Sequence, residues 1–168
     1  GCHGTHEVAV ADLNGDSNDD VVVACHRRPY FASVFLGKGD GAFQPRTDLN
    51  AGDEPTSVVV EDFDKNGMPD LAFASRSANA VSILLGNGDG SFKAASAYQT
   101  SRSPHAIRAG DVNADGILDL VTANDRSNSV SVLFGKGDGS FEQKYELPAN
   151  SLPKSVAVAD VTGDGRPD

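Results

Sequence analysis

The sequence predicts an all-β fold made of repeated four-stranded antiparallel units, the blades of a β-propeller. Three observations lead to this prediction. A composition with 17 Val and 18 Gly among 168 residues is typical of short strands joined by tight turns. A glycine-rich motif recurs about every 49 residues, as GKGDGAF at 37–43, GNGDGSF at 86–92 and GKGDGSF at 135–141. An acidic cluster precedes each motif, and the clusters begin at Asp12, Asp62, Asp111 and Asp160.

Four short strands can be assigned to each unit in the same order. In the second unit, a β-branched run at 57–62 precedes the acidic loop and an apolar run at 71–75 follows it. A polar turn leads to a third run at 81–86, and the glycine motif leads to a fourth strand that begins at Phe92. Such runs are too short for the helices of a βαβ fold, and Gly-Asp-Gly suits a tight hairpin because both residue types tolerate positive φ. Elsewhere the corresponding runs are 120–124 and 130–135, with a first-strand run at 155–160 and fourth strands beginning at Phe43 and Phe141.

The repeat organises the chain as one domain of about three and a half blades. We expect blades at 7–48, 55–98 and 104–147 and the start of a fourth blade at 153–168. A closed ring normally needs at least four blades. The sequence is therefore expected to be an excerpt of a larger propeller, and the alternative is a homodimer in which two copies complete one ring.

Charge and hydropathy exclude several classes of function. A formal net charge of −10 disfavours nucleic acid as a partner, because its phosphates would be repelled. No run of about 18 apolar residues is present, so no membrane-spanning helix is expected. No Ser-His-Asp arrangement and no carboxylate pair stands apart from the repeat. The sequence thus predicts a binding module that is not itself an enzyme.

Each acidic loop places oxygen-bearing side chains at alternate positions, which is the pattern of a calcium site. Ca²⁺ takes six to eight oxygen ligands at about 2.3–2.6 Å. A curled loop can supply side chains from positions one, three, five and nine, together with the carbonyl oxygen of position seven. In the four loops these candidate ligands are Asp12, Asn14, Asp16, Asn18 and Asp20; Asp62, Asp64, Asn66, Met68 and Asp70; Asp111, Asn113, Asp115, Ile117 and Asp119; and Asp160, Thr162, Asp164, Arg166 and Asp168.

Other features of the loops narrow the choice of metal. Gly67, Gly116 and Gly165 at position six permit a sharp turn, whereas Ser17 stands there in the first loop and predicts a different curl. An EF-hand is excluded, because no Glu occupies position twelve and strands flank the loops. Magnesium prefers water-rich octahedral sites, and the absence of His and Cys from the loops disfavours zinc, so we expect three to four Ca²⁺ ions. The alternative is that these loops are ordinary turns closed by Asx hydrogen bonds.

The alternating-Asp loop and the GxGDGxF turn together resemble the FG-GAP/VCBS repeats of extracellular proteins, which are related to the integrin α-subunit propeller. The resemblance covers nearly the whole chain, and it implies a calcium site in the hairpin between the first two strands of each blade. It also implies an extracellular or cell-surface location. Ser17 and Thr162 depart from the family pattern, and Thr162 makes the fourth loop the least typical.

Strand alternation places the acidic loops and glycine turns on one face of the blades and the remaining turns on the other. Five of the eight Arg fall on that opposite face. We expect an anionic partner there, either an acidic glycan or an acidic stretch of another protein. The alternative is that the Arg stems only cover exposed strand ends. The candidate ligand-binding residues are Arg27, Arg28, Tyr30, Arg76, Arg102, His105 and Arg126.

The predicted function is that of a calcium-stabilised extracellular propeller module for binding or adhesion. Lectin-type glycan binding is an alternative, although no Trp and only three Tyr offer little surface for sugar stacking. A further alternative is a propeller within a larger polysaccharide lyase or phospholipase. Cys2 and Cys25 can bridge in an oxidising compartment, but hairpin symmetry pairs Cys25 with Glu7 and disfavours that bridge.

Overall fold

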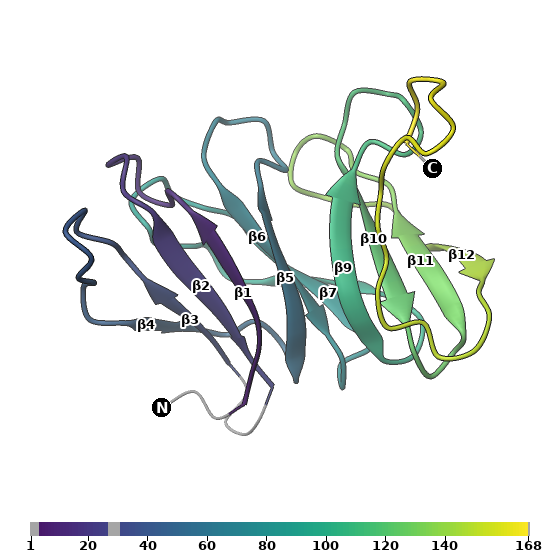
Figure 1. The fold of residues 1–168 in the computed structure, drawn as a ribbon, viewed down its shortest axis with the longest axis horizontal. Helices are drawn as coiled ribbons and strands as arrows, with labels where there is room; N and C mark the ends of the chain where they lie inside the picture. Colours follow the sequence, from purple (N-terminus) through teal and green to yellow (C-terminus); the bar gives the residue numbers. More distant parts are fainter. Residues whose placement is uncertain (1–3, 27–30, 168) are drawn as a thin grey trace.

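A computed structural model describes residues 4–26 and 31–167 of the chain. Within these residues, the regular secondary structure consists of three four-stranded antiparallel sheets (Figure 1). The described part of the chain contains no helix that is long and apolar enough to cross a membrane. The predicted all-β architecture of four-stranded blades is confirmed.

Each sheet is a meander in which consecutive strands pair. Blade 1 contains β1 (Thr5–Ala11), β2 (Asp20–Cys25), β3 (Phe31–Phe35) and β4 (Thr47–Leu49). Blade 2 contains β5 (Pro55–Glu61), β6 (Asp70–Ser75), β7 (Ala80–Leu84) and β8 (Ser96–Gln99). Blade 3 contains β9 (Pro104–Gly110), β10 (Asp119–Asn124), β11 (Ser129–Leu133) and β12 (Tyr145–Pro148).

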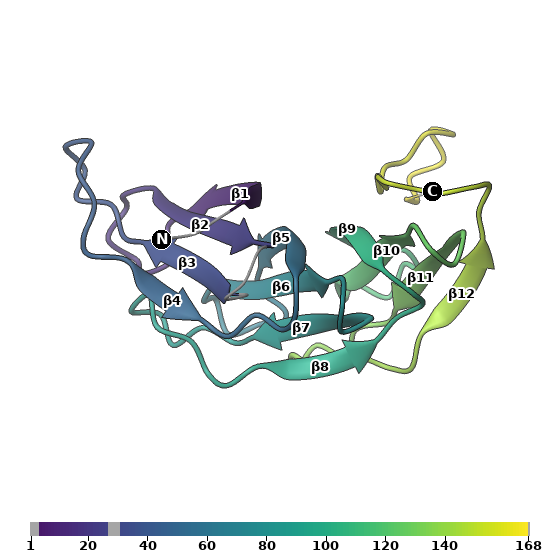
Figure 2. The same ribbon diagram turned by 90° about the horizontal axis from the view of Figure 1, so that it is seen from below.

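The three sheets stand next to one another with their first strands on one side of the molecule (Figure 2). β1 contacts β5, and β5 contacts β9, so these strands form the inner edge of the array. β4, β8 and β12 form its outer edge. Because consecutive strands of each sheet are antiparallel, the loops after the first and third strands of each blade share one end of the array.

The apolar core lies between neighbouring sheets and follows the two-residue alternation of the strands. β6 of the central blade is buried along its whole length. Its Leu71 and Phe73 belong to the cluster shared with blade 1, whereas Ala72 and Ala74 belong to the cluster shared with blade 3. Because both faces of the strand are covered, its residues 71–74 are all apolar and do not alternate with polar residues.

Equivalent residues show what a neighbouring blade covers. Val58 in blade 2 is 4% exposed, whereas Val8 at the corresponding position of blade 1 is 48% exposed. In the described part of the chain, blade 1 has a neighbouring sheet only on the blade 2 side. The same sequence position is therefore buried or exposed according to whether a sheet precedes it.

The glycine turn of each blade also contacts the preceding blade. The amide of Gly90 donates to the carbonyl of Leu13 at 3.2 Å, and the amide of Gly139 donates to the carbonyl of Phe63 at 3.1 Å. A Cβ at Gly139 would overlap the side chain of Leu85. The third glycine of the motif is thus required by contact between blades as well as by the turn.

The fourth strands begin four residues later than predicted, after the Phe of each glycine motif. The Phe of each motif does not start the fourth strand but forms an isolated β-bridge with the first glycine of the same motif. The three are Phe43, Phe92 and Phe141. The ring of Phe141 lies 5.7 Å from that of Phe63 and 5.4 Å from that of Tyr98, both in blade 2. Burial against the preceding blade, rather than strand pairing, explains the aromatic residue.

The first strand predicted at 155–160 is not formed. A strand needs a hydrogen-bonded partner, and among the described residues none of the three sheets includes this run. The segment nevertheless packs on blade 3. Val158 lies so close to Gly110 of β9 that a Cβ at Gly110 would overlap its side chain.

Candidate metal centre

The acidic loops lie at the same end of the blades (Figure 1). In blades 1 to 3 each loop connects the first strand with the second, and the fourth loop follows the unpaired run at 155–160. This is the place in the blade that the family resemblance implies for a metal site.

Backbone amides of the same loop hold the first Asp of each loop. The carboxylate of Asp12 accepts hydrogen bonds from the amides of Gly15 and Ser17, both at 2.8 Å. These bonds, above all the one from Ser17, hold the pKa of Asp12 below its usual value. The equivalent bonds at 2.7–2.8 Å join Gly67 to Asp62, Gly116 to Asp111 and Gly165 to Asp160.

Two positions of each loop adopt left-handed backbone conformations. At position six, φ is 67° at Ser17 and 81–85° at the glycines of the other loops. The expectation that Ser17 would change the curl of the first loop is wrong, since its amide caps Asp12 just as the glycines cap their own first Asp. Position four is also left-handed, even at Lys65 (58°) and Ala114 (61°). The sequence marks this second position only in the first and fourth loops, by Gly15 and Gly163, because Lys65 and Ala114 are not glycines.

The Asp at position nine has a structural role in addition to the predicted one. Both carboxylate oxygens of Asp70 accept backbone hydrogen bonds, from Phe63 at 2.9 Å and from Gly86 at 2.7 Å. Burial raises the pKa of Asp70, and the charges of Asp64 and Asp62 raise it further. The two backbone hydrogen bonds act in the opposite direction and lower the pKa, but burial outweighs them. The equivalent bonds join Asp20 to Leu13 and Gly37, and Asp119 to Val112 and Gly135.

The second loop brings three carboxylates together. One oxygen from each of Asp62, Asp64 and Asp70 lies within 4.8 Å of the other two. Among the described residues no other group of three does so. In the first and third loops the position-five carboxylate instead accepts a hydrogen bond from the side-chain amide of position three, at 3.0 Å from Asn14 to Asp16 and at 2.9 Å from Asn113 to Asp115.

The side chains at position five and the amides at position seven form a further repeated contact. The donors are the amides of Asn18, Met68, Ile117 and Arg166, and the acceptors are the side chains of Asp16, Asn66, Asp115 and Asp164, at 2.7–2.9 Å. These hydrogen bonds form the Asx turns that were the alternative to calcium sites. In the second loop, such a turn and the carboxylate cluster are present together. Ligation by the carbonyls of position seven and by Thr162 stays a prediction, and Asp168 lies outside the described residues.

Comparison with known proteins identifies the repeat. The FG-GAP-like repeat family matches residues 12–73, 62–122 and 111–168. The chain belongs to the FG-GAP-like repeat family. The matched units overlap and together reach from the first acidic loop to the last, so the three glycine motifs and four acidic loops belong to one repeat type.

Solved structures share the fold at low identity. A Photorhabdus luminescens Tc holotoxin pore is 19% identical over 95% of this chain and 8% of its own, with a TM-score of 0.52. BBS1N, solved in complex with ARL6DN and soaked with mercury, is 16% identical over 92% of this chain and 47% of its own, with a TM-score of 0.62. The chain spans less than half the length of either protein. No curated protein matches it.

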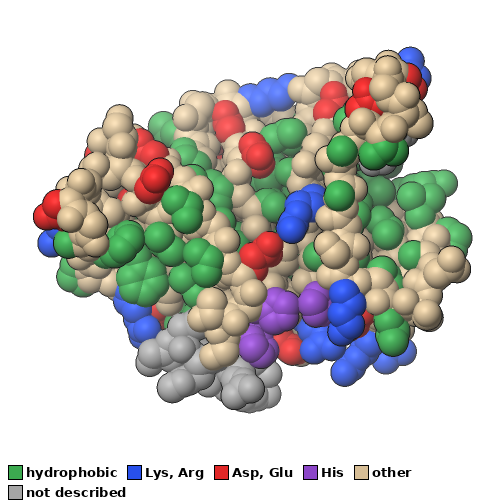
Figure 3. Space-filling view, in the orientation of Figure 1, with side chains coloured by type: hydrophobic (Ala, Val, Ile, Leu, Met, Phe, Trp, Pro, Cys, Tyr) green, Lys and Arg blue, Asp and Glu red, His purple; other side chains and the backbone are tan. Residues whose placement is uncertain are grey.

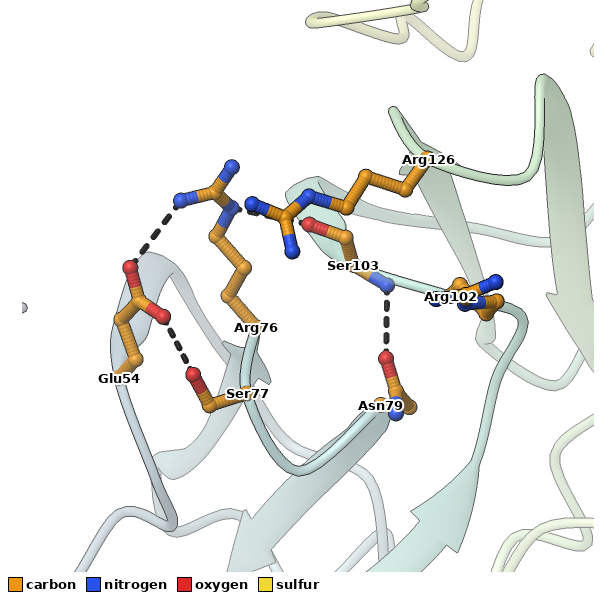
Figure 4. A pocket seen from close by; sticks show the side chains of 7 residues that line it. All are labelled: Glu54, Arg76, Ser77, Asn79, Arg102, Ser103 and Arg126. Carbon is orange, nitrogen blue, oxygen red and sulfur yellow. Dashed lines mark hydrogen bonds and ion pairs between the residues drawn. The ribbon is translucent and has the colours of Figure 1, made fainter.

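The opposite face of these FG-GAP-like blades carries the predicted ligand-binding residues that the structure describes. Arg76 donates to Glu54 at 3.1 Å, to Asp125 at 3.3 Å and to the hydroxyl of Ser103 at 2.9 Å, so it joins blades 2 and 3. Arg102 and Arg126 line a pocket beside it (Figure 4). Arg27, Arg28 and Tyr30 lie outside the described residues.

His105 belongs to a histidine cluster on the same face (Figure 3). Its ring centroid lies 4.9 Å from that of His6, which in turn lies 5.3 Å from that of His26. His6 and His105 both occupy the second position of an inner strand. His26 was missed by the sequence reasoning, because it follows β2 in a turn whose path the repeat does not reveal.

Cys25 differs from its prediction in its partner across the first hairpin. Cys25 is disulfide-bonded, and the other cysteine, Cys2, lies outside the described residues. A register shift between Thr5 and Glu7 places Cys25 opposite Thr5, not opposite Glu7 as predicted. The β-bulge moves the end of β2 toward the start of the chain, so simple symmetry about the loop does not hold here.

Proposed function

We propose that this chain is a calcium-binding, extracellular β-propeller module for binding or adhesion, in which calcium is mainly structural. The observation that carries the proposal is the cluster formed by Asp62, Asp64 and Asp70. Three carboxylates this close repel by about 1 kcal/mol per pair even in a water-like dielectric. A divalent cation would relieve this repulsion and join both ends of the loop.

The donor set favours calcium over other metals. The cluster offers carboxylate oxygens, and Asn66 adds an amide oxygen at position five. No His or Cys stands in the loops, which disfavours zinc, and the number and flexibility of the oxygens suit calcium better than magnesium. The first, third and fourth loops have the same backbone curl, so we propose three to four ions in all.

Two features support an extracellular setting. Cys25 is disulfide-bonded, and disulfides persist in oxidising compartments. Solvent-exposed loops of this kind suit extracellular calcium, where sites with dissociation constants of about 10⁻⁴–10⁻³ M are filled. The partner, a protein or an acidic glycan, would bind the face opposite the loops, and the module itself would perform no catalysis.

Calcium titration of the metal-free protein tests the proposal. We expect heat from three to four sites by calorimetry and little heat from magnesium at the same concentration. At ten times the dissociation constant each site adds about 1.4 kcal/mol to the free energy of unfolding. Three sites should therefore raise the melting temperature by roughly 10 °C over protein in EDTA. Absence of both the heat and the shift at millimolar calcium would refute structural calcium.

A pair of variants separates ion binding from loop folding. Asp64→Asn removes one carboxylate from the second loop, and we expect its calcium affinity to fall by about tenfold. The matched control is the double variant Asp64→Asn with Asn66→Asp, which restores three carboxylates in the order found in the first and third loops. Equal affinity of the single and double variants would show that carboxylate number does not determine binding.

A further inference from the structure

A polar pocket lies between blades 2 and 3 on the face opposite the acidic loops (Figure 4). Its volume is about 180 Å³. All of its lining side chains are polar or charged. The lining residues are Glu54, Arg76, Ser77, Asn79, Arg102, Ser103 and Arg126.

The guanidinium group of Arg76, in one wall of the pocket, is already paired with other side chains of the protein. Its guanidinium bonds Glu54 in its own blade and Asp125 in the next, and its Nε donates to Ser103. These charged partners raise the pKa of Arg76 above its usual value, although burial acts in the opposite direction and more strongly than any one of them. Arg76 therefore fixes the distance between the two blades and is not the group that recognises a ligand.

The remaining charged groups of the pocket are the guanidinium groups of Arg102 and Arg126. Among the described residues, neither Arg102 nor Arg126 forms an ion pair. Figure 4 shows the guanidinium of Arg126 extending above Ser103 toward that of Arg76. The side-chain oxygen of Asn79 accepts from the Ser103 amide at 2.8 Å, which leaves its NH₂ group to donate. A ligand that satisfies these groups must bring acceptor oxygens and negative charge.

The pocket also limits the rest of the ligand. An acidic peptide side chain has an aliphatic stem, and no apolar side chain lines the pocket to receive it. A sugar acid has hydroxyl groups around its ring, which can accept a hydrogen bond from the NH₂ group of Asn79.

We propose that this pocket binds the carboxylate of a uronic acid residue in an acidic polysaccharide, with Arg102 and Arg126 as its recognition groups. The proposal names the partner class of the binding role proposed above and rests on it. Guanidinium forks pair with carboxylates through two parallel hydrogen bonds, which gives the orientation as well as the charge selection.

The test is a titration of the calcium-saturated chain with a hyaluronan hexasaccharide, in which glucuronate alternates with a neutral sugar. We expect binding that shifts the side-chain Nε–H signals of Arg102 and Arg126 in NMR spectra. Arg102→Gln and Arg126→Gln should each weaken binding by about tenfold or more. The matched control, Arg46→Gln, removes the same charge from an arginine paired with Asp48 next to β4, and should bind as the parent chain does.

The methyl ester of the hexasaccharide removes the charge and should not bind. The inference is overturned if the ester binds equally well, if either pocket variant binds like the Arg46→Gln control, or if poly-glutamate binds the pocket in place of the hexasaccharide. The same variants should take up calcium normally. Calcium uptake without saccharide binding would overturn this inference alone, and saccharide binding without calcium uptake would overturn only the structural role of calcium.

Discussion

The carboxylate of Asp70 joins the acidic loop of blade 2 to its glycine turn by accepting a hydrogen bond from the amide of Gly86 at 2.7 Å. The other oxygen of the same carboxylate accepts from Phe63 inside the loop at 2.9 Å. Asp20 and Asp119 make the same pair of bonds in their own blades. The two repeated motifs of the sequence are therefore one structural unit, closed by a buried carboxylate.

Asp70→Asn should destabilise the protein even without calcium. An amide has one acceptor oxygen, so one of the two buried backbone donors loses its partner, at a cost of about 1–3 kcal/mol. Urea unfolding in EDTA measures this loss. Asp53→Asn, at an exposed position, is the control and should have little effect. A loss seen only in the presence of calcium would show that Asp70 acts as a metal ligand alone.

Gly86→Ala should also be strongly destabilising, although Gly86 is not among the residues with positive φ. A Cβ there would overlap the carbonyl oxygen of Pro69, a backbone atom that cannot rotate away. We expect a loss of about 2–4 kcal/mol. Gly15→Ala is the comparison, because its φ is +75° and no heavy atom lies within 4 Å of the added Cβ. It should cost about 1 kcal/mol, and the opposite ranking would contradict the steric explanation.

Ser17→Gly should stabilise the first loop. Ser17 has a φ of 67°, a conformation that glycine adopts without the steric cost of a side chain. The gain is offset partly by the greater freedom of glycine in the unfolded chain, which leaves about 0.5–1 kcal/mol. Thermal melting compares the variant with Ser151→Gly, an exposed serine without positive φ. If both changes have the same effect, strain at Ser17 is not its cause.

The period of the repeat predicts the blades and the position of the loops, because each blade buries the same residues against its neighbour. It does not predict that Phe141 packs on the preceding blade, since an aromatic residue after a turn is equally typical of a strand. Arg76 and Asp125 are 49 residues apart and thus occupy equivalent positions in neighbouring blades. That spacing is a signal of pairing between blades, and it shows only once the blades are known to be adjacent.

The sequence could not predict which side-chain oxygens of each acidic loop lie close enough together to bind one ion. All four loops carry three Asp at the candidate ligand positions, yet the structure groups three carboxylates only in the second of the described loops. The difference depends on whether Asp or Asn stands at position three, because Asn14 and Asn113 hold the following carboxylate by a side-chain hydrogen bond. Such local competition depends on side-chain geometry rather than on the pattern of residue types.

The histidine cluster predicts a loss of stability in mild acid. Burial lowers the pKa of His105 below its usual 6.5, and the positive charges of His6 and Lys154 lower it further. Arg76 acts in the same direction, whereas Asp125 opposes it. The folded state therefore binds a proton at His105 less readily than the unfolded chain does.

The sign of the effect follows from this difference in proton binding. Well above pH 6.5 His105 is neutral in both states and has no effect on stability, whereas near and below pH 6.5 the unfolded chain takes up the proton first and stability falls. Unfolding free energies of the calcium-saturated protein, measured between pH 7.5 and 5.5, should therefore decrease toward acid. His105→Gln should flatten this decrease, and Lys154→Gln should reduce it by removing one repelling charge. An unchanged pH profile in His105→Gln would assign the decrease to another group.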